Sequence, residues 1–287
     1  LDAFRAYDRG EGVDLYKATY ARTFGVKPED VTKKQRQIGK VLELAMGYMG
    51  GVGSFLAFAT MYGVDLKVLA GHTYEALPKS RIYEAHDQWD FFSKKGATND
   101  LDEDTWTALN AIKLAWRDAH PAIRKFWDET ELRVSAAFDA SCFVPPSTYP
   151  CTFTNTTFGL ACRLPSGRVM AYPRAGLAED GERCLFTYYA PRKVSKGFAM
   201  CKTHAGKVVE NITQAVARDV LAANLKSVED AGYKIVLSVH DALITETPDT
   251  PDYCADKLAS LMATPPDWAK DLPLSAAGFE AYRYKKD

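Results

Sequence analysis

The sequence predicts an α+β fold in which a helical region precedes an antiparallel sheet that carries a further helix. Up to about residue 130, apolar residues recur at helical spacing. After about residue 150, short runs rich in β-branched and aromatic residues alternate with Pro, Ser and Gly turn signals. Because helices come first and strands follow, without regular alternation, the order favours α+β over a parallel α/β fold.

The helical region has a well-marked start and several apolar faces. Thr32 and Gln35 form a capping box, which predicts a helix from Lys33 to the glycine cluster that begins at Gly50. Pro121 suits the first turn of another helix. Large apolar residues at helical spacing usually bury, so we expect the tryptophans here in the core rather than stacked on bases.

The second region predicts three short strands, a long helix and a final hairpin. The strands are expected over Thr152 to Phe158, Gly159 to Leu164 and Arg168 to Tyr172. Apolar residues from Val209 to Val228 recur at helical spacing, and Gly232 would end that helix.

The final hairpin has an unusual turn, because two β-rich runs between Ile235 and Thr247 meet at His240-Asp241. A two-residue turn normally takes Asn-Gly or Asp-Gly, since both central residues need a positive φ. Strain of about 1–3 kcal/mol per residue tends to persist where a position has a function, and an acid at a strand tip is well placed to hold a metal. The alternative interpretation is an ordinary solvated loop.

The overall composition restricts the class of protein. The chain has 287 residues, 47% of them hydrophobic and 25% charged, as in a water-soluble globular protein, and a net charge of −1 argues against wholesale coating of nucleic acid. No apolar run has membrane-spanning length and no signal peptide opens the chain. The six cysteines show no zinc or disulfide spacing, so we expect reduced thiols in a cytoplasmic protein. The chain begins with Leu1 rather than Met, and we expect it to be part of a longer protein.

Charged and polar side chains form three candidate binding surfaces. Arg36, Lys40, Leu44 and Tyr48 follow one another at four-residue steps, so one helical face could grip a triphosphate beside an aromatic ring. The alternative is a solvated basic helix with Tyr48 half buried. Asn211, Gln214 and Arg218 form a polar stripe on the long helix, suited to minor-groove acceptors and phosphates. A basic run without acids, from Arg183 to Lys207, indicates either a phosphate track or a solvated face.

Several ordered motifs together resemble those of family A DNA polymerases, the polymerase-I-like enzymes, in the form typical of phage-encoded members. The run from Arg36 to Tyr48, RQIGKVLELAMGY, resembles motif B, and Val239-His-Asp241 resembles motif C. Further blocks follow in the expected order, namely Leu164-Pro-Ser-Gly-Arg168, VENITQAVARD from Val209 to Asp219, and Leu272 to Phe279.

The resemblance implies a right-hand polymerase fold, with residues 12–130 as helical fingers and residues 131–287 as palm. It implies template-directed transfer of a nucleotide from a dNTP to a primer 3′ end by two Mg²⁺ ions, with primer-template DNA as partner. Asp241 would be a catalytic metal ligand at the hairpin tip. The resemblance also implies that the dNTP binds to Arg36, Lys40, Leu44 and Tyr48, and that Lys40 assists the leaving group. It implies that Arg168 contacts the DNA backbone. Asn211 and Gln214 would contact the minor groove, and His240 would contact the primer terminus.

The chain also departs from the family pattern. In the family, motif A carries the partner aspartate and lies upstream of the position that corresponds to Leu1 of this chain. The thumb and any exonuclease domain are missing as well. Ala242 replaces the usual acid after His-Asp, Leu44 stands where most members have an aromatic residue, and Ala45 and Met49 occupy glycine positions. We therefore expect the chain alone to be inactive, with a missing upstream polymerase segment as its natural partner.

Two other classes of function remain as alternatives. A non-catalytic nucleic-acid-binding module would keep the fold without the chemistry. A metal phosphohydrolase built on His240 and Asp241 is disfavoured, because the other histidines lack ligand spacing.

Overall fold

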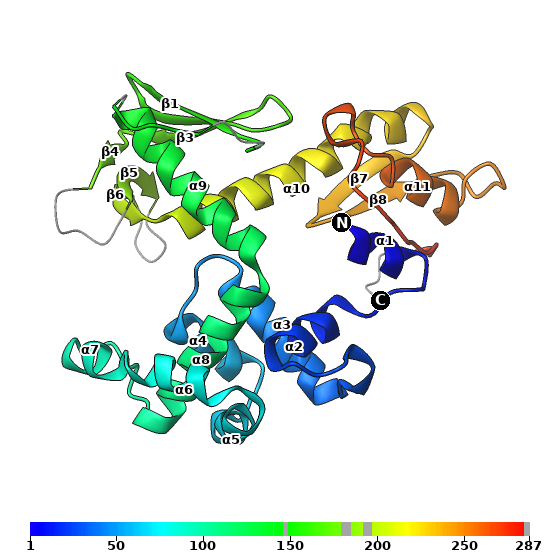
Figure 1. Ribbon diagram of the computed structural model, residues 1–287. Helices are drawn as coiled ribbons and strands as arrows, with labels where there is room; N and C mark the ends of the chain where they lie inside the picture. The colour runs from blue at the N-terminus through cyan, green and yellow to red at the C-terminus, as the bar shows by residue number, and fades with distance from the viewer. Residues whose placement is uncertain (140, 146–148, 179–184, 192–196, 284–287) are drawn as a thin grey trace.

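The computed structural model describes residues 1–139, 141–145, 149–178, 185–191 and 197–283. A helical lobe occupies one end, and helix α9 rises from it to two small sheets (Figure 1). Helix α10 then crosses to a separate hairpin (Figure 1). The arrangement is α+β, as the sequence predicts.

The helical lobe surrounds helix α8, whose side chains form much of its core. Trp106 and Trp116 of α8 and Trp127 of α9 are at most 3% exposed, which confirms that these tryptophans are core residues. The helices are α1 (Asp2–Asp8), α2 (Leu15–Phe24), α3 (Lys33–Met46), α4 (Val52–Met61), α5 (Leu66–Ala76), α6 (Lys79–His86), α7 (Trp89–Lys94), α8 (Glu103–Ala119) and α9 (Pro121–Phe138), with a short 3₁₀ helix, η1, at Pro28–Asp30.

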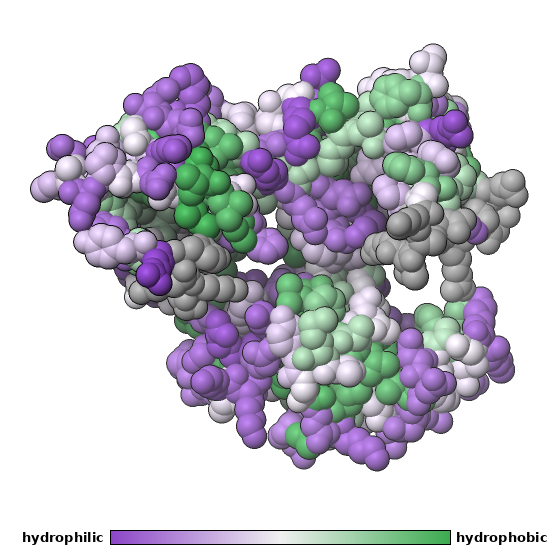
Figure 2. All heavy atoms as spheres, turned by 180° about the vertical axis from the view of Figure 1, so that it is seen from behind, coloured by the Kyte–Doolittle hydropathy of each residue, from purple (hydrophilic) through white to green (hydrophobic). Residues whose placement is uncertain are grey.

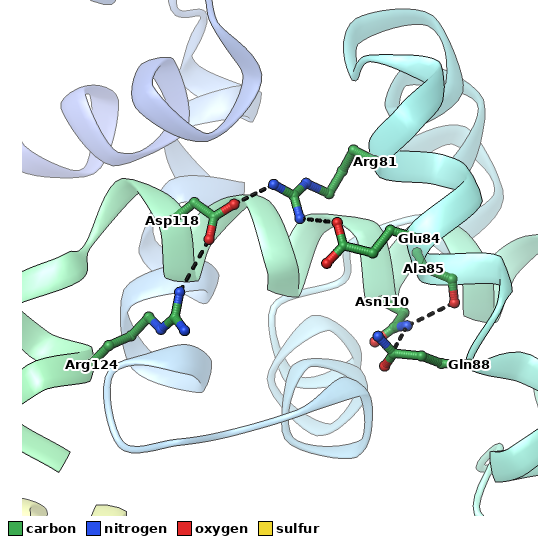
Figure 3. Close-up of polar contacts among 7 residues, drawn as sticks. All are labelled: Arg81, Glu84, Ala85, Gln88, Asn110, Asp118 and Arg124. Carbon is green, nitrogen blue, oxygen red and sulfur yellow. Dashed lines mark hydrogen bonds and ion pairs between the residues drawn. The ribbon is translucent and has the colours of Figure 1, made fainter. Parts of the chain in front are cut away.

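Polar contacts tie the outer helices of this lobe to α8. Arg81 of α6 pairs with Asp118 of α8, and Asp118 in turn accepts from Arg124 of α9 at 3.2 Å (Figure 3). Asn110 is fully buried and donates to the Ala85 carbonyl at 2.9 Å (Figure 3). These contacts fix α6 against the helices that lead to the sheets.

The strands of the described residues form two three-stranded antiparallel sheets and one hairpin. The first strand ends at Thr156, two residues before the predicted end, and the third begins at Val169 instead of Arg168. The strands are β1 (Thr152–Thr156), β2 (Gly159–Arg163), β3 (Val169–Pro173), β4 (Gly176–Leu177), β5 (Phe186–Pro191), β6 (Phe198–Thr203), β7 (Lys234–Val239) and β8 (Ala242–Glu246).

Helix α10 (Ala205–Asp230) connects the sheets to the hairpin. Its first half packs Val208 and Ile212 into a second core that includes residues of the sheets. Gly232 follows the helix with a φ of +89°, which agrees with the predicted stop. Helix α11 (Ala255–Met262) packs on its second half, and a 3₁₀ helix, η2, follows at Asp267–Ala269. In the described part of the chain, no helix is long and apolar enough to cross a membrane.

Helix α3 begins at the predicted capping box, but it ends at Met46 rather than at the glycine cluster. Side chains from two other helices bind the carbonyl groups of the next turn. Trp127 Nε1 donates to the Gly47 carbonyl at 3.3 Å, and Arg117 Nη2 lies 3.4 Å from the Met49 carbonyl. These donors satisfy carbonyls that would otherwise lack partners at a helix end, and so stabilise the turn.

The turn after α3 lies directly against the first turn of α10. A Cβ added to Gly206 would lie 2.3 Å from the Tyr48 carbonyl oxygen and 2.6 Å from Met49 Cβ. The Gly206 N–H also points at Met49 Sδ, 3.1 Å away. Only glycine permits this approach of the two backbones.

We expect Gly206→Ala to lower the free energy of unfolding by about 1–3 kcal/mol, because the added methyl group overpacks a backbone contact. Gly71→Ala is the matched control, since Gly71 is also helical and a Cβ there meets nothing within 4 Å. It should raise stability by about 0.5–1 kcal/mol. Urea unfolding monitored by tryptophan fluorescence measures both, and a Gly206→Ala protein as stable as the parent would contradict the close approach.

Glu43 joins α3 to Thr19 of α2 and to His120, which lies between α8 and α9. Thr19 Oγ1 lies 2.5 Å from Glu43 Oε1, and His120 Nε2 lies 3.4 Å from the same oxygen. Burial acts to raise the pKa of the Glu43 carboxyl, but hydrogen bonds from His120 and Thr19 outweigh it, so the pKa lies below its ordinary value of 4.5. The folded state therefore favours the ionised form of the Glu43 carboxyl.

A lowered pKa in the folded state contributes stability that is complete above the unfolded pKa and lost as pH falls through the folded pKa. The difference in unfolding free energy between the parent and Glu43→Gln should therefore shrink below about pH 4.5. Urea unfolding across pH 3 to 7 measures it, with exposed Glu29→Gln as control. A difference independent of pH would show that the carboxylate charge is not what the contact requires.

Candidate nucleotide and nucleic-acid interface

Three of the four residues predicted for the triphosphate face share one side of α3. Arg36, Lys40 and Leu44 lie at four-residue steps along the helix. The side opposite them packs into the core, where Val41 and Leu42 are fully buried. The helix therefore presents two cations and an apolar side chain away from the core.

Both cations already contact acidic or aromatic side chains from outside α3. Arg36 Nη2 lies 2.8 Å from Asp14 Oδ2, and its guanidinium lies 5.2 Å from the ring centroid of Tyr16. Lys40 Nζ lies 5.0 Å from the ring centroid of Tyr62. Helix α3 is packed between α2 and α4, and these neighbours supply partners that the sequence pattern does not reveal.

Asp14 is held in place independently of Arg36, because its side chain caps helix α2. Its Oδ1 accepts the backbone N–H groups of Tyr16 and Lys17, both at 3.1 Å. Burial opposes ionisation of Asp14, but the hydrogen bonds from Arg36 and the backbone prevail and lower its pKa. Hydrogen bonding to Asp14 raises the pKa of Arg36. An anion that binds Arg36 must therefore share the guanidinium with a fixed carboxylate.

Tyr48 lies outside α3, in the turn that follows it, so it does not continue the stripe as predicted. Its half-buried ring packs against the core of the helical lobe. Burial raises the pKa of the phenol, the charge of Glu210 adds to this, and a hydrogen bond with Thr213 opposes it. Both partners belong to α10, so Tyr48 connects the α3 end to the first half of that helix.

The polar stripe on α10 lies next to this connection. Gln214 is exposed and its Nε2 donates to Glu210 at 3.2 Å. Asn211 is half buried and its Nδ2 donates to the Tyr172 hydroxyl at 3.2 Å. Arg218 is exposed one turn further on. Gln214 and Arg218 are therefore the more accessible members of the stripe.

Arg168 reaches the same helix from the turn between β2 and β3. Its Nε lies 2.6 Å from Asp219 Oδ1, and its Nη2 donates to the Ala215 carbonyl at 3.0 Å. Nearly half of the Arg168 side chain is exposed. The structure thus places Arg168 beside the polar stripe, although the two are about 50 residues apart in sequence.

The hairpin turn is strained at one of its two central residues. His240 has a φ of +54°, whereas Asp241 does not adopt a positive φ, which differs from the expectation for both. Both side chains are exposed between the paired residues Val239 and Ala242. The hairpin packs on the second half of α10.

The hairpin tip offers one oxygen ligand for a cation. Mg²⁺ is usually held by one or two carboxylates together with substrate phosphates and water, and Asp241 suits the first of these requirements. Among the described residues, however, no three His, Cys, Asp or Glu side chains gather as metal ligands would. The described residues therefore fit part of a magnesium site but not a pair of metal ions.

Two carboxylates in these surfaces were not singled out from the sequence. Asp14 could have been noticed as a helix cap two residues before Tyr16, but nothing local connects it to Arg36. Asp219 is four residues after Ala215 on the helix face that meets Arg168, a signal visible only once the pairing of the two segments is known. Four of the six cations in the predicted basic run lie outside the described residues, namely Arg183, Arg192, Lys193 and Lys196.

Comparison with known proteins supplies one informative similarity. No family model matches the chain. A protein named DNA polymerase, from Bacillus phage SP02, is 34% identical over 277 residues, which is 95% of this chain and 36% of that protein. A match of this extent includes both the helical lobe and the sheets, and the chain is thus similar, over nearly all of its length, to about a third of a phage DNA polymerase.

Proposed function

We propose that this chain is a portion of a phage-type DNA-directed DNA polymerase of family A, with residues 12–130 as fingers and residues 131–287 as palm. The observation that carries the proposal is the 34% identity to a phage DNA polymerase over 95% of the chain. The longer protein takes part in DNA replication in the cytoplasm of the bacterial host. Residues of the polymerase-like motifs lie on α3, on α10 and in the hairpin.

The dNTP binds along α3. Arg36 and Lys40 bind its phosphates as cationic donors, and Lys40 also stabilises the charge that develops on the departing pyrophosphate. Leu44 and Tyr48 lie beside the sugar and base. The packing of Tyr48 against Glu210 and Thr213 supports this proposal, because it connects the nucleotide face to the helix proposed for DNA.

Primer-template DNA lies along α10. Gln214, with Asn211 behind it, meets minor-groove acceptors, and Arg168 binds the DNA backbone. His240 contacts the primer terminus. The exposure of Gln214 and the remaining exposed edge of Arg168 support these roles.

Asp241 supplies one carboxylate of a Mg²⁺ site, and other carboxylates come from an upstream polymerase segment. Two features support a further segment at the hairpin. The chain spans 36% of its phage relative. Val236 and Leu237 of β7 are each about half exposed, and hydrophobic atoms gather over this part of the surface (Figure 2). A covering segment would remove these apolar side chains from water and so stabilise the hairpin.

A second candidate function is a non-catalytic nucleic-acid-binding module derived from a polymerase. The absence of a three-ligand metal cluster from the described residues is the observation that favours it. Such a module would bind DNA along α10 and would not need Asp241 in any longer protein.

Substitution of Lys40 tests the nucleotide face. We expect Lys40→Ala to weaken dNTP binding by about 10- to 100-fold, the cost of a hydrogen bond to a charged group. Lys34→Ala is the control, because Lys34 is exposed at the start of α3 and lies about 120° around the helix from Lys40, and it should change affinity less than about twofold. Titration of a fluorescent dNTP measures both dissociation constants. Equal effects would refute the assignment.

Substitution of Asp241 separates the two candidate functions. Primer extension by residues 1–287 alone should be undetectable. In a protein that joins this chain to an upstream polymerase segment, Asp241→Asn should lower Mg²⁺-dependent extension at least about 100-fold. The control is Asp252→Asn, because Asp252 is also exposed and lies between β8 and α11. Extension that is indifferent to Asp241→Asn would favour the non-catalytic module.

A further inference from the structure

Asp219 is a buried carboxylate whose partners all come from the turn between β2 and β3. Its side chain is 9% exposed. Ser166 Oγ donates to Oδ2 at 2.5 Å, and Arg168 Nε donates to Oδ1 at 2.6 Å. Each oxygen thus has its own donor, as a buried ionised carboxylate requires.

The guanidinium of Arg168 is held along one edge and free along the other. Nε donates to Asp219 and Nη2 donates to the Ala215 carbonyl, so two nitrogens are fixed against α10. Nη1 has no protein partner in the described part of the chain, and 47% of the side chain is exposed. An arginine side chain normally loses much rotamer freedom when it binds a phosphate. Here that freedom is already lost before any ligand binds.

The turn itself is constrained by the same contacts. Gly167 has a φ of +86°, and the Arg168 N–H lies 3.3 Å from Ser166 Oγ, the hydroxyl that donates to Asp219. Asp219 therefore sets both the path of the turn and the direction of the side chain that follows it.

We propose that Asp219 is a positioning residue, which holds Arg168 so that its free edge meets a phosphate of primer-template DNA. This inference rests on the proposed function, since it assumes that the α10 surface binds DNA. It assigns a role to an acid that does not itself touch DNA.

The direction in which Asp219→Asn changes DNA affinity distinguishes positioning of Arg168 from simple neutralisation of its charge. Removing a negative charge beside a DNA-binding surface ordinarily strengthens binding, because phosphate repulsion falls. If Asp219 only neutralised Arg168, Asp219→Asn would therefore bind DNA more tightly. If Asp219 positions Arg168, the same substitution must weaken binding, since the guanidinium loses its fixed orientation.

The test is a fluorescence anisotropy titration of residues 1–287 with labelled primer-template DNA at several salt concentrations. We expect Asp219→Asn and Arg168→Ala each to weaken binding by about three- to tenfold, roughly 1 kcal/mol. The double variant should be no weaker than Arg168→Ala alone, because a positioning residue acts only through its partner. The salt slope should fall by about 0.9 in each variant.

Asp230→Asn is the matched control, because it removes an exposed acid from the same helix, paired with Lys226 at 2.6 Å. It should leave binding unchanged or slightly tighter. Ser166→Ala is a second variant that removes one partner of Asp219 and leaves the Arg168 ion pair in place. It should weaken binding less than Asp219→Asn, and only while Arg168 is present.

Three outcomes would overturn the inference. Unchanged or tighter binding by Asp219→Asn would show neutralisation. Additive losses in the double variant would show that Asp219→Asn acts through general destabilisation and not through Arg168. If the unmodified chain itself fails to bind DNA, both this inference and the proposed DNA-binding surface fall; if it binds and only the variant pattern fails, the proposed function stands.

Discussion

The close contact between Gly206 and the turn at Tyr48 and Met49 is the constraint on which the candidate interface depends. It brings the end of α3 and the start of α10 within backbone contact distance. Trp127 and Arg117 hold the same turn from the other side by binding its carbonyl groups. Two helices that are far apart in sequence therefore keep a fixed distance, and Tyr48, after the end of α3, lies beside Glu210 and Thr213 of α10.

Each of two arginines predicted to bind phosphates has an internal carboxylate partner. Arg36 pairs with Asp14, and Arg168 pairs with Asp219. Such pairs have two opposite effects on ligand binding. They reduce the entropy that an arginine loses when it binds, and they partly neutralise the charge that attracts the ligand. The balance differs between the two sites, because the Asp219 side chain is 9% exposed, whereas that of Asp14 is 24% exposed and also caps helix α2.

The hairpin tip is strained and sparsely partnered in comparison with the α3 and α10 surfaces. His240 adopts a left-handed backbone conformation without being glycine, which costs free energy that the fold must recover elsewhere. Asp241 beside it is exposed, and the neighbouring strand β7 leaves Val236 and Leu237 half exposed. A charged tip and an uncovered apolar strand on one small hairpin are the features expected of a surface that is completed by another segment.

The sequence by itself determined the order of elements, the start of α3, the stop near Gly232 and the burial of the tryptophans. Each of these depends on local signals, namely a capping box, a glycine with positive φ and apolar spacing, which act over a few residues. Only the tertiary structure decided that Tyr48 leaves the helix and that Arg36 and Arg168 pair with Asp14 and Asp219. Those outcomes depend on partners 22 and 51 residues away and on donors from α8 and α9, and no pattern within one helix encodes which distant side chain will meet it.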